Sequence, residues 1–217
     1  MILVPVKNLA NAKQRLASVV GQGTRIELAR AMLHDVLDAL AMCSNRPQVA
    51  LVTSDPFAVD LAREFNFEVI ADLANFSETD AIEMATQLCE SRGVESTLVI
   101  PADIPLIQSS EVTTILQAAP EEGSVLVPAA DGRGTNAVLR RPAALFPLRF
   151  GNDSFKPHLA AAHASRKPCV VLSLPGIALD IDNPSDLANL ASAPGDTRAQ
   201  CMIRQWNLRQ LPVAANE

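Results

Sequence analysis

The chain has 217 residues, of which 48% are hydrophobic. This length and apolar content suffice for one large domain with a sizeable core, so a single domain is expected. The net charge of −6 and the pI near 5.1 argue against nucleic acid and acidic membrane as general partners, because an acidic surface repels polyanions. Any site for phosphate groups must therefore be local.

The cysteines and the N-terminus indicate the compartment. The four cysteines are far apart, and none belongs to a Cys-x-x-Cys pair or a Cys/His cluster of metal-ligand spacing, so we expect buried, reduced thiols. The apolar N-terminus reaches Lys7 too soon for a signal sequence, and no window has the length of a membrane span. These features predict a soluble cytoplasmic protein.

Apolar runs alternate with helical patterns along the first half of the chain. Residues 2–6 are typical of a strand that is covered on both faces. Thr24 and Glu27 have the spacing of a capping box, and a helix of about five turns is predicted from there to Asn45. Further strands are expected at 49–52, 68–70 and 97–100, with helices at 57–65 and 80–91.

The second half continues this alternation. Strands are expected at 125–127, 137–139, 170–172 and 177–179, and helices near 154–164 and 184–191. The predicted fold class is α/β, with a Rossmann-like, mostly parallel sheet flanked by helices in one domain of residues 1–192. An antiparallel strand at the edge of the sheet is left open.

Residues 193–217 lose the periodicity and are expected to form a C-terminal tail or arm. They contain Arg198, Arg204 and Trp206, the only tryptophan. These residues could pack on a partner subunit in a homodimer or close over the site as a lid. A helix that covers the domain's own core is the favoured alternative.

A cluster of cations follows the first expected strand. Lys7, Lys13 and Arg15 fall within nine residues, in the loop after the carboxyl end of that strand. Lysine offers a point charge and arginine a bidentate fork to phosphate oxygens, so the cluster suits a polyphosphate. A solvated, charged loop explains these residues equally well when they are taken alone.

Acidic residues follow two later strands. Asp103 precedes Pro105, which cannot continue strand pairing, so the carboxylate should lie at the sheet edge where open α/β sheets bind ligands. Asp180 and Asp182 alternate along an extended segment and should share one face. Mg²⁺ prefers carboxylate oxygens with water and phosphates, so all three are candidate metal ligands. The alternative role for Asp182 is to cap the helix that begins at Pro184.

Two turn segments carry candidate anion-binding groups. In the first, residues 131–137, Gly134 would let the main chain approach a ligand, and Thr135 adds a hydroxyl. In the second, residues 149–158, Ser154 opens a helix whose free N–H groups could face a phosphate. Ordinary turns explain the glycines as well, and His158 could either bond a ligand or pack within its helix.

These segments form an ordered series of motifs: Val-Pro-Val-Lys with Ala-Lys-x-Arg-Leu, Pro-Ala-Asp-x-Pro-Leu, Asp-Gly-x-Gly-Thr-Asn-Ala, Phe-Gly-x-x-Ser-Phe, and Leu-Asp-Ile-Asp-x-Pro-x-Asp-Leu. From Met1 to about Leu190, the series resembles the guanylyltransferases of coenzyme F-420 biosynthesis. The resemblance implies a fold like that of the nucleotide-diphosphate-sugar transferases. It also implies that GTP reacts with 2-phospho-L-lactate, phosphoenolpyruvate or 3-phospho-D-glycerate and that pyrophosphate is released.

The resemblance also implies roles for individual residues. The ligands of Mg²⁺ would be Asp103, Asp180 and Asp182. The groups that face the GTP phosphates, and with Asp103 carry catalysis, would be Lys7, Lys13 and Arg15. The groups that hold the phosphate and carboxylate of the acceptor acid would be Thr135, Gly151 and Ser154. One segment departs from the family pattern, because residues 76–82 replace the Leu-Asn-x-Ala segment expected near the base, so strict use of GTP is not carried over.

Three alternatives remain beside this interpretation. A glycosyltransferase that uses a nucleotide-sugar would share the acidic metal-binding motif, but it would not need the Gly-Thr-Asn and Phe-Gly-x-x-Ser segments. A molybdenum-cofactor guanylyltransferase or a sugar-phosphate nucleotidyltransferase would usually have a glycine-rich loop after the first strand, but residues 7–16 contain no glycine. A catalytically silent nucleotide-binding subunit is the alternative from a different class. The scarcity of histidine fits phosphoryl chemistry, because a phosphomonoester with a second pKa of about 6 is largely dianionic at pH 7 and needs no base.

Overall fold

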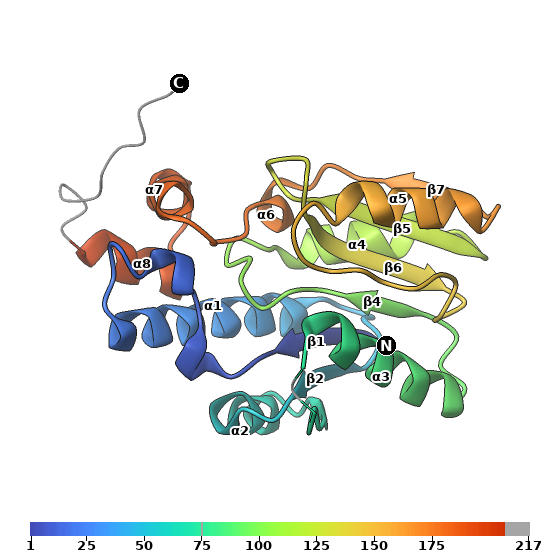
Figure 1. Ribbon diagram of the computed structural model, residues 1–217, viewed down its shortest axis with the longest axis horizontal. Coiled ribbons are helices and arrows are strands. Elements are labelled where there is room, and N and C mark those ends of the chain that lie inside the picture. The colour runs from blue at the N-terminus through green and yellow to red at the C-terminus, as the bar shows by residue number, and fades with distance from the viewer. Residues whose placement is uncertain (75, 207–217) are drawn as a thin grey trace.

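The computed structural model describes residues 1–74 and 76–206, so the last part of the expected tail, residues 207–217, lies outside the described residues. A seven-stranded sheet with helices on both faces forms the domain (Figure 1). The strands are β1 Ile2–Val6, β2 Val49–Thr53, β3 Glu68–Ile70, β4 Thr97–Val99, β5 Gly123–Pro128, β6 Thr135–Arg141 and β7 Cys169–Val171.

The strand order is β3-β2-β1-β4-β6-β5-β7. Only β6 runs antiparallel to its neighbours, β4 and β5, and all other pairs are parallel. The predicted α/β class is therefore confirmed, but the antiparallel strand lies inside the sheet and not at its edge. The physical reason is the short turn between β5 and β6, which reverses the chain and inserts β6 between β4 and β5.

The strand order creates a crevice at the carboxyl ends of β1 and β4. From β1 the chain continues to β2 on one side, whereas β4 pairs with β1 on the other. Open sheets bind ligands where the order reverses in this way. Lys7 directly follows β1, and Asp103 lies just beyond β4, so the fold brings these two residues to the same edge of the sheet.

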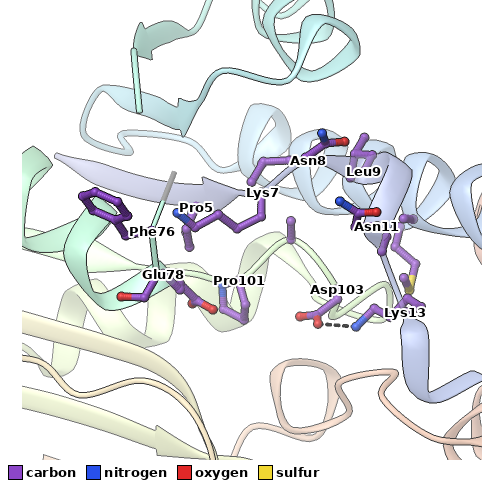
Figure 2. Close-up of a pocket in the computed structure, with 16 residues that line it drawn as sticks. Pro5, Lys7, Asn8, Leu9, Asn11, Lys13, Phe76, Glu78, Pro101 and Asp103 are labelled. Atoms are coloured by element: carbon purple, nitrogen blue, oxygen red, sulfur yellow. Dashed lines mark hydrogen bonds and ion pairs between the residues drawn. The ribbon is translucent and has the colours of Figure 1, made fainter. Parts of the chain in front are cut away.

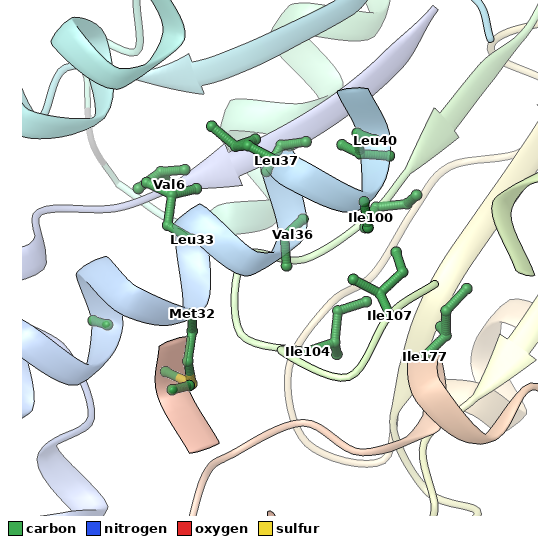
Figure 3. Packing of buried hydrophobic residues seen from close by; sticks show 14 of the residues in the cluster. Val6, Met32, Leu33, Val36, Leu37, Leu40, Ile100, Ile104, Ile107 and Ile177 are labelled. Atoms are coloured by element: carbon green, nitrogen blue, oxygen red, sulfur yellow. The ribbon is translucent and has the colours of Figure 1, made fainter. Parts of the chain in front are cut away.

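The helices are α1 Gln22–Met42, α2 Pro56–Glu64, α3 Glu78–Ser91, α4 Ser109–Ala118, α5 Phe155–Ala164, α6 Pro175–Ala178, α7 Pro184–Ser192 and α8 Arg198–Gln205, with 3₁₀ turns η1 Leu9–Asn11 and η2 Gln14–Leu16. Alternate strand residues divide the core: Ile2 and Val4 face the layer that contains α1, and Leu3 faces the layer of α3 and α5. Leu33, Val36 and Leu37 of α1 pack against this first face beside Val6 (Figure 3).

Three local predictions were wrong. Helix α1 begins at Gln22 with Gly21 as its N-cap, so Thr24 lies inside the helix and forms no capping box. The expected strand at 177–179 is instead occupied by the end of α6. Gly176 explains this, because its N–H donates to Glu111 Oε1 at 2.7 Å, and an added Cβ would lie 2.4 Å from the Leu106 carbonyl oxygen. Helix α4, which carries Glu111, was not predicted.

Helix α8 packs on the domain. Ala199 and Ile203 of α8 are fully buried, and the Asp35 carboxylate of α1 accepts hydrogen bonds from the N–H groups of Arg198 and Ala199. For residues 198–205 the structure thus agrees with the alternative of a helix on the domain's own core. The prediction of buried thiols holds for Cys43 and Cys89 but is wrong for Cys201, which is exposed. None of the helices in the described ranges is long and apolar enough to cross a membrane.

Candidate active site

Two cavities open at the crevice and meet at Asp103. The first, of about 410 Å³, is lined by the loop after β1, including Lys7 and Lys13, and we call it the lysine cavity. The second, of about 500 Å³, is lined by residues 129, 131 and 133–136, by the turn at 150–154 and by Asp180. We call it the hydroxyl cavity. Glu78, Pro101 and Asp103 line both, so the two cavities adjoin at these residues.

Lys13 lies between two carboxylates at this junction. The residue joins η1 to η2 in the left-handed conformation (φ 53°), which turns its side chain back toward the sheet edge. Its Nζ lies 2.5 Å from Asp103 Oδ2 and 3.0 Å from Asp182 Oδ1. The dashed line in Figure 2 marks the first of these two contacts. Burial opposes the charged form, but the two carboxylates outweigh it and hold the pKa of Lys13 above its usual value.

Lys7 is held by a residue that the sequence prediction missed. Its Nζ lies 2.6 Å from Oδ2 of Asp72, whose side chain is 5% exposed. Asp72 follows β3 by two residues, and it is brought to Lys7 because parallel strands end at the same edge. An acidic residue just after the third strand was the available signal, although nothing local to it indicated a lysine 65 residues away.

Arg15 is separated from the two lysines. Its Nη1 lies 3.2 Å from Asp182 Oδ2 and its Nη2 lies 2.9 Å from Asn152 Oδ1, at the rim of the hydroxyl cavity. Its side chain is 62% exposed. The structure therefore divides the predicted cation cluster, with the two lysines in the lysine cavity and Arg15 beside the other one.

The three predicted metal ligands all line the hydroxyl cavity, although Asp180 and Asp182 do not lie on a strand. The segment after α6 has no regular structure, and the N–H of Ile181 donates to the Asp103 carbonyl at 3.1 Å, which holds it beside the end of β4. Asp180 Oδ1 accepts from Asn136 Nδ2 at 3.1 Å. Burial, together with the charges of Asp103 and Asp182, raises the pKa of Asp180.

The capping alternative for Asp182 was wrong. Asn183 is the N-cap of α7, and its side chain accepts hydrogen bonds from the N–H groups of Ser185 and Asp186. The carboxylate of Asp182 instead faces Lys13 and Arg15. Its place in the site is therefore explained by the cations and not by the helix.

The carboxylate oxygens at the junction are of the kind that Mg²⁺ prefers. Within residues 1–74 and 76–206, no three His, Cys, Asp or Glu side chains are gathered closely enough to hold a metal ion by themselves. Mg²⁺ commonly takes only one or two protein carboxylates and completes its shell with water and phosphates. The Lys13 ammonium shared by Asp103 and Asp182 marks a position where these oxygens stabilise a cation.

The hydroxyl cavity ends in a buried polar group. Thr135 is the first residue of β6, and its Oγ1 lies 3.2 Å from Ser154 Oγ and 3.0 Å from His158 Nδ1. The N–H of Arg149 donates to His158 Nε2 at 2.8 Å. Burial and the nearby Arg140 lower the pKa of His158 to about 4, so its ring is neutral at pH 7.

The turns of this cavity offer fewer main-chain donors than expected. The N–H groups of Arg133 and Gly134 both donate to Asp131 Oδ1, and the N–H of Phe155 donates to the Arg133 carbonyl. The expectation that both turns present such donors to an anion is therefore wrong for these three groups. Gly151, with a φ of 117° and open space around its Cα, remains at the rim, beside the hydroxyls of the cavity.

Glu78 is a second residue that the sequence prediction missed. It is the first residue of α3, after the N-cap Ser77, and it lies in the segment that departs from the family pattern. Burial, followed by the charge of Asp103, raises its pKa to about 7. An acidic residue in the first turn of a helix is commonplace, so no local pattern indicated its position between the two cavities.

Solved structures share this fold. A putative nucleotide-diphospho-sugar transferase from Desulfovibrio desulfuricans superposes with a TM-score of 0.75 and 21% identity, over 94% of this chain and 93% of that chain. A CMP:2-keto-3-deoxy-manno-octonic acid synthetase superposes with a TM-score of 0.57 and 13% identity, over 88% of this chain and 95% of that chain. These likenesses establish the fold alone.

The sequence comparisons define the family. A phosphoenolpyruvate guanylyltransferase of Roseiflexus castenholzii is 34% identical over 208 residues, which are 96% of this chain and 95% of that protein. A 2-phospho-L-lactate guanylyltransferase of Methanothermobacter thermautotrophicus is 29% identical over 215 residues, which are 99% and 94% of the two chains. The chain belongs to the family described as guanylyl transferase CofC like, whose model matches residues 1–214. It is thus a guanylyltransferase, an enzyme of the nucleotidyltransferase class.

Proposed function

We propose that this enzyme transfers a guanylyl group from GTP to a small phosphorylated carboxylic acid and releases pyrophosphate, as a step of coenzyme F-420 biosynthesis. The observation that carries the proposal is the meeting of the two cavities at Asp103. A triphosphate suits the lysine cavity, and a small acid suits the hydroxyl cavity. Each reactant then has a cavity whose side chains suit it, and the phosphates of the two reactants would meet near Asp103.

The acceptor is phosphoenolpyruvate, 2-phospho-L-lactate or 3-phospho-D-glycerate. Six phosphoenolpyruvate guanylyltransferases are 29–36% identical to this chain, four of them at 33% or more, whereas two 2-phospho-L-lactate guanylyltransferases are 29% and 23% identical. This difference supports phosphoenolpyruvate as the first acceptor to test. Thr135 and Ser154 would donate to the acid, and Gly151 at the rim would leave room for it.

In the proposed reaction, a phosphate oxygen of the acceptor forms a bond to the α-phosphorus of GTP, and the bond from that phosphorus to the bridging α–β oxygen breaks. The acceptor phosphate is largely dianionic at pH 7 and needs no general base. The main difficulty is repulsion between two anions, so cations must neutralise charge and align the reactants. Lys7 and Lys13 would do so by exchanging Asp72 and Asp103 for phosphate oxygens.

Mg²⁺ fits the same site. Asp103, Asp180 and Asp182 would hold it, and when bound it supplies further positive charge to the phosphates of GTP. The Lys13 side chain would then leave its present place between two of these carboxylates. Residues 76–78, which line the lysine cavity, would determine the preference for guanine. We also propose that the enzyme acts in the cytoplasm and that it forms a homodimer.

The test is to incubate the protein with GTP and Mg²⁺ and with each of the three acids separately, and to identify the product by mass. We expect a guanylylated acid and pyrophosphate in at least one mixture, and no product without Mg²⁺. Replacing GTP by ATP, CTP or UTP measures base preference in the same assay. Absence of product with all three acids would refute the assignment of the acceptor, even though the fold and family stand.

A further inference from the structure

Three buried polar side chains at the end of the hydroxyl cavity are joined by hydrogen bonds. They are Thr135, Ser154 and His158, which are 7%, 3% and 1% exposed, and we call them the Thr135 group. Its members come from β6, from the N-cap of α5 and from within α5. Thr135 and Ser154 line the cavity, whereas His158 lies behind them and does not.

The tautomer of His158 follows from its partners. A main-chain N–H can only donate, so His158 Nε2, which receives the hydrogen bond from Arg149, carries no proton. The neutral ring must then carry its proton on Nδ1. Because Nδ1 lies 3.0 Å from Thr135 Oγ1, this N–H donates to the threonine hydroxyl. The main chain of the turn before α5 thus sets the direction of a hydrogen bond that leads into the cavity.

This direction leaves one hydroxyl proton for a ligand. Thr135 Oγ1 accepts from His158 Nδ1 and also from Ser154 Oγ. If the bond between the two hydroxyls is reversed, the proton of Ser154 is released in place of that of Thr135. In either case the Thr135 group has one O–H to spare, and none of the hydrogen bonds formed within the described residues takes it up.

We propose that His158 is a positioning residue for the acceptor: through Thr135 it makes the group a hydrogen-bond donor to a phosphate or carboxylate oxygen of the phosphorylated acid. This inference rests on the proposed function, since it concerns the acid in the hydroxyl cavity. A protonated Nε2 with a bare Nδ1 would have the opposite effect. Thr135 would then donate to the ring, and an anion would meet oxygen lone pairs.

Two variants separate this role from packing. The amide of His158→Asn reaches the position of Nδ1 and keeps a donor to Thr135, but it leaves the Arg149 N–H without its acceptor. The amide of His158→Gln reaches the position of Nε2 and keeps an acceptor for Arg149, but it leaves Thr135 without its donor. Both replace one buried ring by a smaller amide, so they are matched in what they remove from the core.

We expect His158→Gln to raise the KM for phosphoenolpyruvate about tenfold, which is the effect of one hydrogen bond to a charged group, and His158→Asn to change it less than about threefold. The KM for GTP should stay within about twofold of wild type in both variants. Calorimetric titration of each folded variant with phosphoenolpyruvate should give the same order of dissociation constants. Equal losses in both variants, or a loss only in His158→Asn, would overturn the proposal.

A second measurement does not depend on the variants or on turnover. Nitrogen NMR of wild-type protein labelled at histidine should show His158 with a protonated Nδ1 and an unprotonated Nε2 at pH 7. A protonated Nε2 would overturn the inference even if both variants failed to fold. Failure of the proposed function has a different signature, because wild-type protein would then release no pyrophosphate from GTP with any of the three acids.

Discussion

The two cavities prepare for anions by different means. In the lysine cavity, the cations are already engaged by carboxylates, Lys7 with Asp72 and Lys13 with Asp103 and Asp182, so a nucleotide must replace existing ion pairs. In the hydroxyl cavity, Thr135 and Ser154 are held by neutral hydrogen bonds that a ligand would extend. The comparison teaches that one side should rearrange on binding, whereas the other is built beforehand.

The largest expected effect comes from the residue that the two sides share. Asp103→Asn should lower kcat by about a thousandfold or more, because it removes a carboxylate from the junction where charge must be neutralised. Pyrophosphate release measures the rate, and the melting temperature shows whether the variant is folded. Asp60→Asn, in an exposed ion pair with Arg63, is the matched control and should leave both unchanged. Near-normal turnover of a folded Asp103→Asn variant contradicts the metal and catalytic assignments.

The next effect should be confined to the lysine side. Lys7→Met keeps the length of the side chain and removes its charge, and we expect the KM for GTP to rise about 10- to 100-fold, the usual effect of a charge-assisted hydrogen bond. The KM for the acid should change less than about threefold. The control is Lys167→Met, since Lys167 is a surface residue that pairs with Glu122. An equal rise in both KM values would contradict the assignment of GTP and the acid to separate cavities.

In the hydroxyl cavity, a smaller change is expected, and it should affect the KM for the acid and not the KM for GTP. Thr135→Val preserves shape but removes the hydroxyl, so the KM for the acid should rise about tenfold while that for GTP stays within about twofold. Thr135→Ser retains the hydroxyl and should behave like wild type. Steady-state kinetics with each substrate varied in turn make the comparison. If valine and serine act alike, then the hydroxyl does not bind the acid.

The last effect concerns the stability of the ligand-free protein, and it arises from Glu78. Because the pKa of Glu78 is raised in the folded protein, from its ordinary 4.5 to about 7, the folded state binds more protons than the unfolded chain in this interval. Stability should therefore fall as the pH rises from about 5 to 7. Glu78→Gln should remove this fall and stabilise the ligand-free protein at pH 8, by at most about 3 kcal/mol.

Chemical denaturation of both proteins at pH 5 and pH 8 measures the effect of Glu78. At pH 5 the ionisation of this residue should contribute little to the difference between them. Unfolding free energies that change with pH by the same amount in wild type and in Glu78→Gln would show that the pKa of this carboxyl is not raised in the folded protein. The Glu78 carboxyl would then ionise in the folded protein as it does in the unfolded chain.

The sheet and its functional edge were predictable because their signals are local. The apolar run before Lys7 and the proline after Asp103 each indicate a strand end, and parallel strands bring such ends together. The gathering of Asp180 and Asp182 was also anticipated, but for the wrong structural reason. Their segment is placed by a hydrogen bond to the Asp103 carbonyl and not by strand pairing.

The remaining features depend on contacts that the sequence does not encode locally. Helix α6 forms where a strand was expected because Glu111, 65 residues earlier, accepts a hydrogen bond from Gly176. Asp72 and Glu78 belong to the site only because the third strand and the start of α3 approach the loop after β1. The donor direction of the Thr135 group likewise needs the fold, since it depends on the N–H that His158 meets.

The central claim is that nucleotide and acid occupy different cavities and meet at Asp103. A crystal structure with a non-hydrolysable GTP analogue, Mg²⁺ and phosphoenolpyruvate tests it most directly. We predict the triphosphate against Lys7 and Lys13, with Lys13 turned away from its present carboxylates, and the acid within hydrogen-bond distance of Thr135 or Ser154. A triphosphate bound at Thr135, or an acid bound among the lysines, would contradict it.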